Sequence, residues 1–225
     1  MIYTKNLLCF LLLVPIIGIL LLLLNSSFNH KLLKTISLAT SAITFIVSLL
    51  IWVLFDKSTG DFQFVETILW SSNLNINLTV GIDGISLFFV ILTTLLIFLC
   101  LLSSWYSINF NLKEYLISFL IMEFFLIGVF CVLDLLLFYV FFESVLIPMY
   151  LIIGIWGSRE RKIRAAYFFF LYTLLGSVLM LLGILYLHYQ IGTTDYEILL
   201  SVLLTEKEQK LLWISFFASF ATKVP

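Results

Sequence analysis

Charged residues are scarce in this sequence: Asp, Glu, Lys and Arg make up 11% of its 225 residues, whereas 63% are hydrophobic. A soluble domain is about one-quarter charged and about half apolar, and one core could not bury so much apolar side chain. The formal net charge of −1 includes no basic excess and gives no indication of nucleic-acid binding. The composition therefore predicts a protein that is largely embedded in lipid.

Residues that bind metals or act as nucleophiles are also few. The three cysteines, Cys9, Cys100 and Cys131, lie in apolar runs without CxxC spacing. This pattern favours small buried side chains over a metal site or disulfides. His30 lies in a predicted loop and His188 at a predicted helix end, and neither belongs to a catalytic or phosphate-binding motif. We therefore expect no metal and no cofactor on this chain.

Long apolar runs dominate the sequence instead. A membrane-spanning helix needs roughly 20 apolar residues, because a helix rises about 1.5 Å per residue and the hydrocarbon core is about 30 Å thick. Six runs are long enough, namely Leu7–Leu24, Thr35–Phe55, Ile85–Ser103, Tyr115–Leu133, Leu135–Trp156 and Ala165–His188. A seventh begins at Leu211 and continues to Pro225, so residues 211–225 are expected to form an incomplete helix.

The predicted fold is an all-α polytopic transmembrane bundle of six complete helices plus the start of a broken seventh. We expect one membrane domain over residues 1–225, with residues 56–84 as a loop outside the membrane. Small residues follow one face of the sixth predicted helix (Thr173, Gly176, Ser177 and Gly183). Such a face lets another helix approach closely.

Basic residues gather in alternate loops. The first, third and fifth loops contain Lys31, Lys34, Lys113, Arg159, Arg161, Lys162 and Arg164, whereas the second and sixth contain only Lys57, Lys207 and Lys210. Because basic loops stay on the inner side, the pattern predicts an outer N-terminus and an inner Arg159–Arg164 cluster. The cluster is interpreted as a topology anchor, with a lipid or partner site as the alternative.

Three ionisable residues fall inside the predicted spans: Glu123, Glu143 and Lys223. A charge at the bilayer centre costs about 2.5–3.5 kcal/mol, so such residues face a bundle interior or a wet cavity and mark functional sites. The helix rise puts Glu143 roughly 13 Å and Glu123 roughly 16 Å from the outer end marked by Asp134. Lys223 lies roughly 19 Å from Lys210 by the same measure. All three are predicted to lie near the midplane, on three different helices.

Prolines lie beside two of these charges. Pro148 removes the hydrogen bond to the Ser144 carbonyl, next to Glu143, and Pro225 interrupts the helix close to Lys223. A simple kink is one interpretation of each proline. Helices broken beside a midplane charge are also a recurrent feature of ion carriers.

A Glu143–Lys223 pair admits two interpretations. A buried carboxylate and ammonium stabilise each other's charged form, and separating them favours proton uptake by the carboxylate and proton loss by the amine. A pair that opens and closes is therefore a proton switch, whereas a fixed pair is a staple between two helices. The residues favour the switch and leave the staple open.

Four segments carry a resemblance to a known family: Gly81–Phe89, Asp134–Met149, Ile155–Ser158 and Phe217–Pro225. Together with the rest of the chain they resemble the antiporter-like chain 4 family of NADH:ubiquinone oxidoreductase (respiratory complex I), in its mitochondrial form. The runs Phe-Glu-Ser-Val-Leu-Ile-Pro and Lys-Val-Pro are the most specific part of this resemblance. The wider family includes subunits of cation/proton antiporters and membrane-bound hydrogenases.

The resemblance implies a proton-pumping, multi-pass subunit of the membrane arm of complex I, in the mitochondrial inner membrane. FMN, iron–sulfur clusters and ubiquinone would belong to other subunits. Glu143 and Lys223 match the family's charge pair between helix five and broken helix seven. Glu123 matches a further buried glutamate, which we expect to couple the pair to a neighbouring antiporter-like subunit. The implied partners are other membrane-arm subunits and lipid.

Family members contain a further set of helices that this sequence lacks. We therefore expect either a second polypeptide that supplies the C-terminal half of the inverted-repeat pair or a partial sequence. Two other functions stay open: a stand-alone cation/proton antiporter or channel, and a structural helical scaffold. The sequon Asn77-Leu-Thr79 offers a check, because a glycan there would indicate the secretory pathway.

Overall fold

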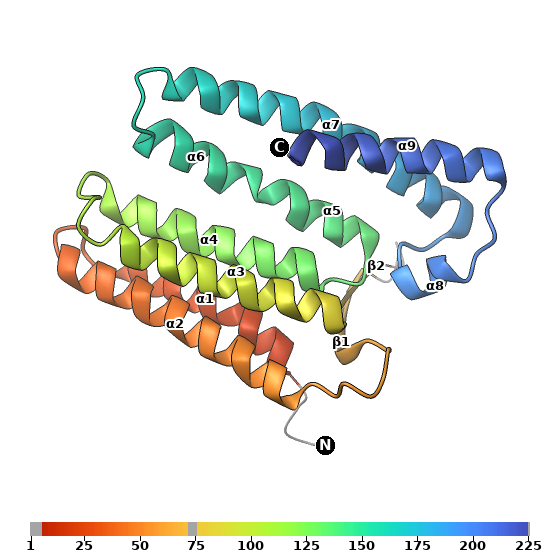
Figure 1. Cartoon of the computed structure of the whole chain (residues 1–225), viewed down its shortest axis with the longest axis horizontal. Helices are drawn as coiled ribbons and strands as arrows, with labels where there is room; N and C mark the ends of the chain where they lie inside the picture. The colour runs from red at the N-terminus through yellow and green to blue at the C-terminus, as the bar shows by residue number, and fades with distance from the viewer. Residues whose placement is uncertain (1–5, 72–75, 225) are drawn as a thin grey trace. The chain divides into compact units, whose positions relative to one another are not determined.

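The computed structural model describes residues 6–71 and 76–224 of the chain (Figure 1). Within this part, six segments are long and apolar enough to cross a membrane: α1 (Leu7–Leu24), α2 (His30–Leu54), α3 (Gly84–Ser103), α4 (Leu112–Cys131), Leu135–Trp156 and α7 (Lys162–Ile191). Large apolar side chains such as Leu20, Leu96 and Leu182 are about half exposed on outward helix faces. The predicted polytopic helical bundle is confirmed.

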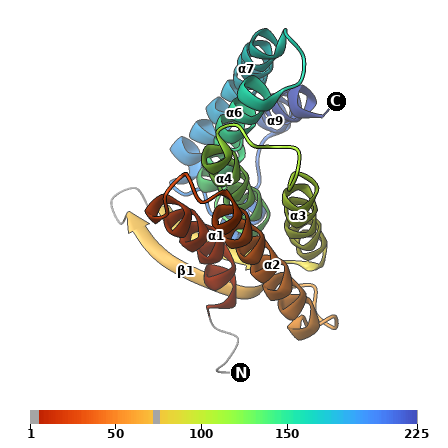
Figure 2. The ribbon, with the colours of Figure 1, turned by 90° about the vertical axis from the view of Figure 1, so that its left-hand side faces the viewer.

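The chain divides into two compact units. Unit 1 comprises Met1–Glu66 and Val80–Cys131, and unit 2 comprises Thr67–Thr79 and Val132–Pro225. In unit 1, α2 packs against α1, α3 and α4, and α4 also contacts α1 and α3 (Figures 1 and 2). A Cβ atom on Gly18 of α1 would lie 2.7 Å from Thr40 Cγ2 of α2, so a glycine is required where these two helices meet.

Two lysines close helix ends in unit 1. The Lys113 ammonium donates to the carbonyl oxygens of Leu23 and Asn25, each at 2.9 Å, at the end of α1. The Lys34 ammonium donates to the Trp105 carbonyl at 2.6 Å, just after α3. A cation satisfies carbonyls that have lost their helical donors and complements the negative end of the helix dipole. The basic residues of the first and third loops thus gather at one end of unit 1.

The predicted extramembrane loop contains regular structure. Strands β1 (Gln63–Ser71) and β2 (Ile76–Ile82) form a two-stranded sheet. The sequence analysis missed these strands, although Ile76–Ile82 alternates apolar and polar residues with the period of a strand. After β2, Asp83 begins α3 through a capping box with Ser86: the Ser86 N–H donates to Asp83 Oδ1 at 2.7 Å, and the Asp83 N–H donates to Ser86 Oγ at 3.0 Å.

Unit 2 is built around α7. This helix contacts α5 (Leu135–Ser144), α6 (Leu146–Trp156) and α9 (Glu206–Lys223), and α9 runs beside it (Figure 1). A short helix, α8 (Tyr196–Leu200), lies in the connection between α7 and α9. A Cβ atom on Gly183 would lie 2.6 Å from Ser215 Oγ of α9, and one on Gly176 would overlap Thr222. The predicted close approach along the small residues of this helix is confirmed.

Several helix bounds differ from the predicted ones because hydropathy marks the apolar span rather than the end of the backbone hydrogen bonding. Helix α2 begins at His30, so this residue lies in a helix instead of the predicted loop. Helix α9 begins at Glu206, five residues before Leu211, because Thr205 and Glu208 form a capping box there. Helix α9 ends at Lys223, and Pro225 lies outside the described residues.

Candidate functional site

Glu143 and Lys223 lie close together in unit 2. Lys223 Nζ is 3.9 Å from Glu143 Oε2, and the two side chains are 19% and 21% exposed. A hydrogen-bonded ammonium and carboxylate lie about 2.7–2.9 Å apart, so these two groups form an ion pair without a direct hydrogen bond, an arrangement called open below. The structure thus brings together two of the three charged residues that the sequence analysis selected.

The Lys223 ammonium takes its close contacts from the residue before Glu143. It donates a hydrogen bond to the Phe142 carbonyl oxygen at 2.6 Å, and it lies 3.2 Å from the centroid of the Phe142 ring. The carbonyl belongs to the last turn of α5, where the helix dipole is negative and helical donors run out. The ring face adds a cation–π contact. The ammonium is therefore stabilised without contacting the carboxylate directly.

The helix that carries Glu143 is interrupted immediately after it. Helix α5 ends at Ser144, and α6 begins at Leu146. The backbone hydrogen bond from the Val145 N–H to the Phe141 carbonyl is long, at 3.4 Å. Pro148, a buried residue in the first turn of α6, has no N–H to donate. Glu143 therefore lies at a point where the backbone of the span is weakly hydrogen-bonded.

The Glu143 carboxylate is buried without a close donor. Neither of its oxygens has a hydrogen-bond partner among the described residues. Its polar neighbours are Tyr139, one turn earlier on α5, and Ser177 of α7. The Ser177 hydroxyl donates to the Leu174 carbonyl at 2.9 Å. Both oxygens of this carboxyl group therefore keep acceptor capacity that no donor among the described residues fills.

Ser219 lies on the same helix face as Lys223 and was missed by the sequence analysis. It lies one turn before Lys223 on α9, is fully buried, and its hydroxyl has no hydrogen-bond partner within the described part of the chain. The spacing of four residues puts both side chains on one helix face, and this spacing was the available signal. Tyr139, Glu143, Ser177, Ser219 and Lys223 are called the unit 2 polar cluster below.

Glu123 lies in unit 1, on α4, and is fully buried. Its Oε1 atom makes a short hydrogen bond with the Thr44 hydroxyl of α2. Its Oε2 atom has no partner among the residues that the structure describes. Glu123 thus forms a separate buried acidic site with a hydroxyl neighbour that the sequence analysis did not identify.

Asp134 fixes the start of α5. It is 3% exposed, its Oδ1 atom accepts from the Leu137 N–H at 3.0 Å, and its Oδ2 atom accepts from the Thr194 hydroxyl at 2.6 Å. The backbone is joined at the same place, because the Leu135 N–H donates to the Thr194 carbonyl at 2.9 Å. This end of α5 is therefore tied to the segment that follows α7, nine residues before Glu143.

No group of three or more His, Cys, Asp or Glu residues that could hold a metal ion is found in the described ranges. The three cysteines are free thiols: Cys131 is buried, Cys9 is half-buried and Cys100 is exposed. The prediction that all three are buried was wrong for Cys100. The outward face of a membrane helix is as apolar as its packed face, so an apolar run does not distinguish the two.

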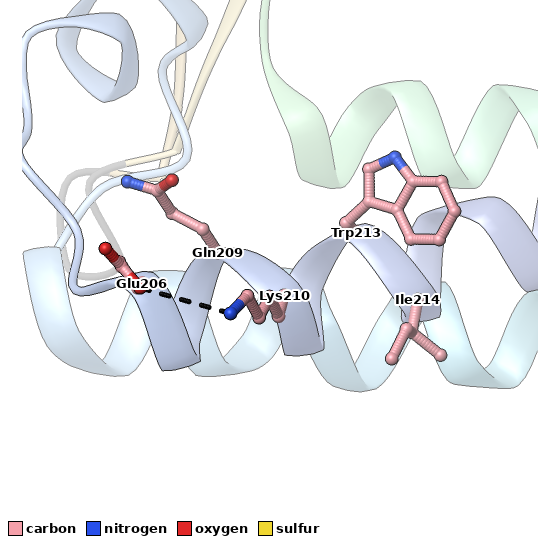
Figure 3. Close-up of a pocket in the computed structure, with 5 residues that line it drawn as sticks. All are labelled: Glu206, Gln209, Lys210, Trp213 and Ile214. Atoms are coloured by element: carbon pink, nitrogen blue, oxygen red, sulfur yellow. Dashed lines mark ion pairs between the residues drawn. The ribbon is translucent and has the colours of Figure 1, made fainter.

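A surface pocket of about 520 Å³ lies at the start of α9, lined by Glu206, Gln209, Lys210, Trp213 and Ile214 (Figure 3). Glu206 and Lys210 form an ion pair at 3.9 Å, with side chains 90% and 78% exposed. None of the residues that line this pocket belongs to the unit 2 polar cluster. The Glu206–Lys210 pair has the same separation as the Glu143–Lys223 pair but is exposed to solvent. Substitutions in it are therefore controls for substitutions in the buried pair.

The chain is similar to a family of membrane subunits. Residues 132–225 match the family described as NADH:quinone oxidoreductase/Mrp antiporter, transmembrane. NADH-ubiquinone oxidoreductase chain 4 of Chondrus crispus is 60% identical over 213 residues, which cover 95% of this chain and 43% of the relative. The protein of the same name from Arabidopsis thaliana is 59% identical, with 96% of this chain and 43% of the relative covered.

Solved structures share the fold. A chain of respiratory complex I from Thermus thermophilus with bound NADH superposes with a TM-score of 0.82 at 27% identity, covering 95% of this chain and 43% of that chain. A chain of an archaeal membrane-bound sulfane sulfur reductase superposes with a TM-score of 0.73 at 20% identity, covering 95% and 33%. The present chain thus spans about two-fifths of the length of the chain 4 relatives it matches.

Proposed function

Because the chain belongs to the NADH:quinone oxidoreductase/Mrp antiporter family of membrane subunits, we propose that it is part of a proton-translocating subunit in the membrane arm of respiratory complex I. It is a multi-pass membrane protein. The names of its relatives, which are NADH-ubiquinone oxidoreductases, support a place in the mitochondrial inner membrane. The remaining length of the subunit would come from a second polypeptide or from further chain.

The open Glu143–Lys223 pair is the observation that carries this proposal. In a closed pair the carboxylate and the ammonium are both charged, and Glu143 passes its proton to Lys223 as the pair closes. As the pair opens, Lys223 releases a proton towards one side of the membrane, and Glu143 takes up a new proton from the opposite side. One proton moves per cycle, and both residues return to their starting forms.

The local structure supports both arrangements of the pair. In the open arrangement, the Phe142 carbonyl and ring stabilise the Lys223 ammonium until its proton leaves. The long Val145–Phe141 hydrogen bond between α5 and α6 supports movement of the end of α5, whereas the Asp134 contacts support a fixed start of this helix. A switch needs a structural element that can adopt two positions, here the end of α5 that carries Glu143. A change in another part of the complex can then favour one of the two positions.

Proton movement against a membrane potential needs an external source of energy, about 2.3 kcal/mol per charge for each 100 mV. We propose that electron transfer from NADH to ubiquinone supplies it, with FMN and iron–sulfur clusters on other subunits. Glu123, in unit 1, would couple the Glu143–Lys223 pair to a neighbouring antiporter-like subunit. The partners of this chain are then the other membrane-arm subunits and lipid.

Glu143→Gln tests the proposal in the assembled complex. Glutamine keeps the size of the side chain and cannot accept the proton, so the number of protons translocated per electron should fall sharply while the complex still assembles. The measurement is proton uptake or release by vesicles during NADH oxidation. Glu206→Gln, which removes the exposed pair at the same 3.9 Å distance, should leave this ratio unchanged.

Two results would count against the switch. A normal proton-to-electron ratio in an assembled Glu143→Gln complex would remove Glu143 from the proton path. Failure of this variant to assemble, with normal assembly of Glu206→Gln, would instead indicate a staple between α5 and α9. Breaking a buried pair by removing one partner destabilises a fold strongly, so the staple makes a distinct prediction.

A further inference from the structure

A line of buried hydroxyl side chains follows one face of α2. Its members are Ser37, Ser41, Thr44 and Ser48, and each is at most 1% exposed. Spacings of four, three and four residues put all four on the same side of the helix. The line covers roughly 16 Å of the helix axis, or about half the thickness of the hydrocarbon core. We name it the α2 hydroxyl stripe.

Hydroxyls in membrane helices commonly bond to their own backbone and permit close packing, and those of the stripe do this. Each donates to the carbonyl three residues earlier. Two further contacts are not explained by local bonding. Ser48 Oγ lies 3.0 Å from Thr94 Oγ1 of α3, and Thr44 Oγ1 makes its short hydrogen bond with Glu123 Oε1 of α4.

The Thr44 contacts indicate where the proton lies. Thr44 Oγ1 is 2.8 Å from the Ser41 carbonyl oxygen and also bonds with Glu123 Oε1, but a hydroxyl has only one proton to donate. Both contacts are satisfied when a neutral Glu123 donates to Thr44 and Thr44 donates to Ser41. The buried Oε2 atom, without a partner in the described residues, also fits an uncharged acid better than a carboxylate. In this assignment, the fully buried acid directs an exchangeable proton into the stripe.

We propose that the α2 hydroxyl stripe is a proton path that ends on Glu123, with Thr44 as the residue that passes the proton to and from its carboxyl group. At Thr44, one O–H bond forms as the other breaks, so the hydroxyl returns to its neutral form. Neighbouring members of the stripe are about one helical turn apart, a gap that a water molecule can bridge. The proton comes from solvent water, and no oxidant or reductant is needed.

The proton path itself lies within unit 1 and does not depend on the proposed function. Only the role of this path in proton pumping rests on that function. The path can therefore be tested on the full chain in lipid vesicles by infrared spectroscopy. A neutral carboxylic acid has a carbonyl band that shifts when its proton is replaced by deuterium, and Glu123→Gln identifies the Glu123 band by removing it. The rate of the shift after transfer to D₂O measures proton access to Glu123.

Thr44→Val keeps the shape of the side chain and removes the hydroxyl. We expect the hydrogen–deuterium exchange of the Glu123 band to slow by about tenfold or more. The variant lacks the hydroxyl that bonds to Glu123, so the proton must reach the acid without this buried hydrogen bond. Thr40→Val is the matched control on the same helix: Thr40 faces Gly18 of α1, and its hydroxyl donates to the Ser37 carbonyl. Exchange in this control should stay at the wild-type rate.

Ser48→Ala supplies a second variant in case Thr44→Val does not fold, as judged by circular dichroism. It removes the hydroxyl that contacts Thr94 and leaves the Thr44–Glu123 contact in place, and it should also slow the exchange. The path is overturned if Glu123→Gln removes no acid band, if both variants exchange at the wild-type rate, or if Thr40→Val slows exchange equally. Glu143→Gln should leave the exchange unchanged, so the outcome is independent of the pumping test.

Discussion

The Lys223 ammonium lies between two sets of partners. The Phe142 carbonyl and ring contact it at 2.6 and 3.2 Å, whereas the Glu143 carboxylate is 3.9 Å away. The carbonyl and the ring are uncharged, so they stabilise the cation without fixing it as strongly as a bonded carboxylate would. In the proposed switch, the balance between these partners decides how much of the time the pair is open.

Phe142→Leu should shift this balance. The variant keeps the backbone carbonyl and removes the ring, which contributes about 0.5–2 kcal/mol as a cation–π partner. The closed Glu143–Lys223 pair should gain population, and the rate of NADH-driven proton translocation should fall by roughly two- to thirtyfold, the equivalent of that energy. Vesicle proton uptake measures the rate.

The control for this prediction is Phe217→Leu, because Phe217 lies on the same helix as Lys223, is 57% exposed and stacks on Trp213. It should translocate protons at the normal rate. Equal rates in Phe142→Leu and in the wild type would mean that the ring has no part in holding the open form.

The sequence predicted the charged residues better than their partners. Glu123, Glu143 and Lys223 stand out because an ionisable residue in a long apolar run is costly. Thr44 and Ser219 do not stand out, because serine and threonine are common in membrane helices and bond to their own backbone. Their importance depends on which helix face meets which neighbour, and that is decided only by the tertiary fold.

Among the helices, α9 shows most clearly how a few polar residues set where an element begins. The Thr205 hydroxyl and N–H donate to Glu208 Oε2 at 2.7 and 2.8 Å, and the Tyr186 hydroxyl donates to Oε1 at 2.8 Å. These hydrogen bonds, first of all the one from the Thr205 hydroxyl, hold the pKa of the Glu208 carboxyl below its usual range. Acid should therefore weaken the first turn of α9.

The sign of this pH effect follows from the lowered pKa. A carboxyl group with a lower pKa in the folded chain stabilises the fold fully above its unfolded-state pKa, and this contribution is lost as the pH falls through the folded-state pKa. Amide hydrogen exchange at Thr205 and Gln209, whose N–H groups donate to the Glu208 carboxylate and the Thr205 carbonyl, should accelerate as Glu208 becomes protonated, after correction for the intrinsic effect of pH. In Glu208→Gln the protection should not change over the same pH range. If these amides of the wild-type chain are equally protected at low and at neutral pH, the capping box does not stabilise the first turn of α9.

Helix existence and type followed from hydropathy, whereas helix interruptions and ends did not follow completely. The span Leu135–Trp156 was expected as one helix with a proline-induced break, and the structure divides it into α5 and α6 around Val145. The bounds of α2 and α9 moved outward because caps and backbone hydrogen bonds extend beyond the apolar run. The two strands between α2 and α3 were missed because Gln63–Ser71 does not alternate apolar and polar residues, and the alternation of Ile76–Ile82 is short.

The chain spans 43% of its Chondrus crispus relative, and the proposed function belongs to a larger assembly. Native-gel separation of the source membranes, followed by mass spectrometry, should find this chain in a very large complex that oxidises NADH. The same band should contain a peptide that corresponds to the remaining length of chain 4.

A different migration would change the conclusion. Recovery of the chain alone, or in a small oligomer without flavin and iron–sulfur subunits, would favour a stand-alone cation carrier. It would also leave the Glu143–Lys223 pair without a source of energy. A glycan on Asn77 would exclude the mitochondrial location in a similarly direct way.

The lysines that close helix ends in unit 1 also explain how so few charges suffice for the chain. By the positive-inside rule, Lys34 and Lys113 are expected to hold their loops on the inner side during membrane insertion, before any tertiary contact exists. Once the helices have packed, the same ammonium groups bind the Trp105, Leu23 and Asn25 carbonyls. On this expectation, orientation and folding use one set of residues in succession, and neutralising either lysine should impair membrane insertion first and helix packing afterwards.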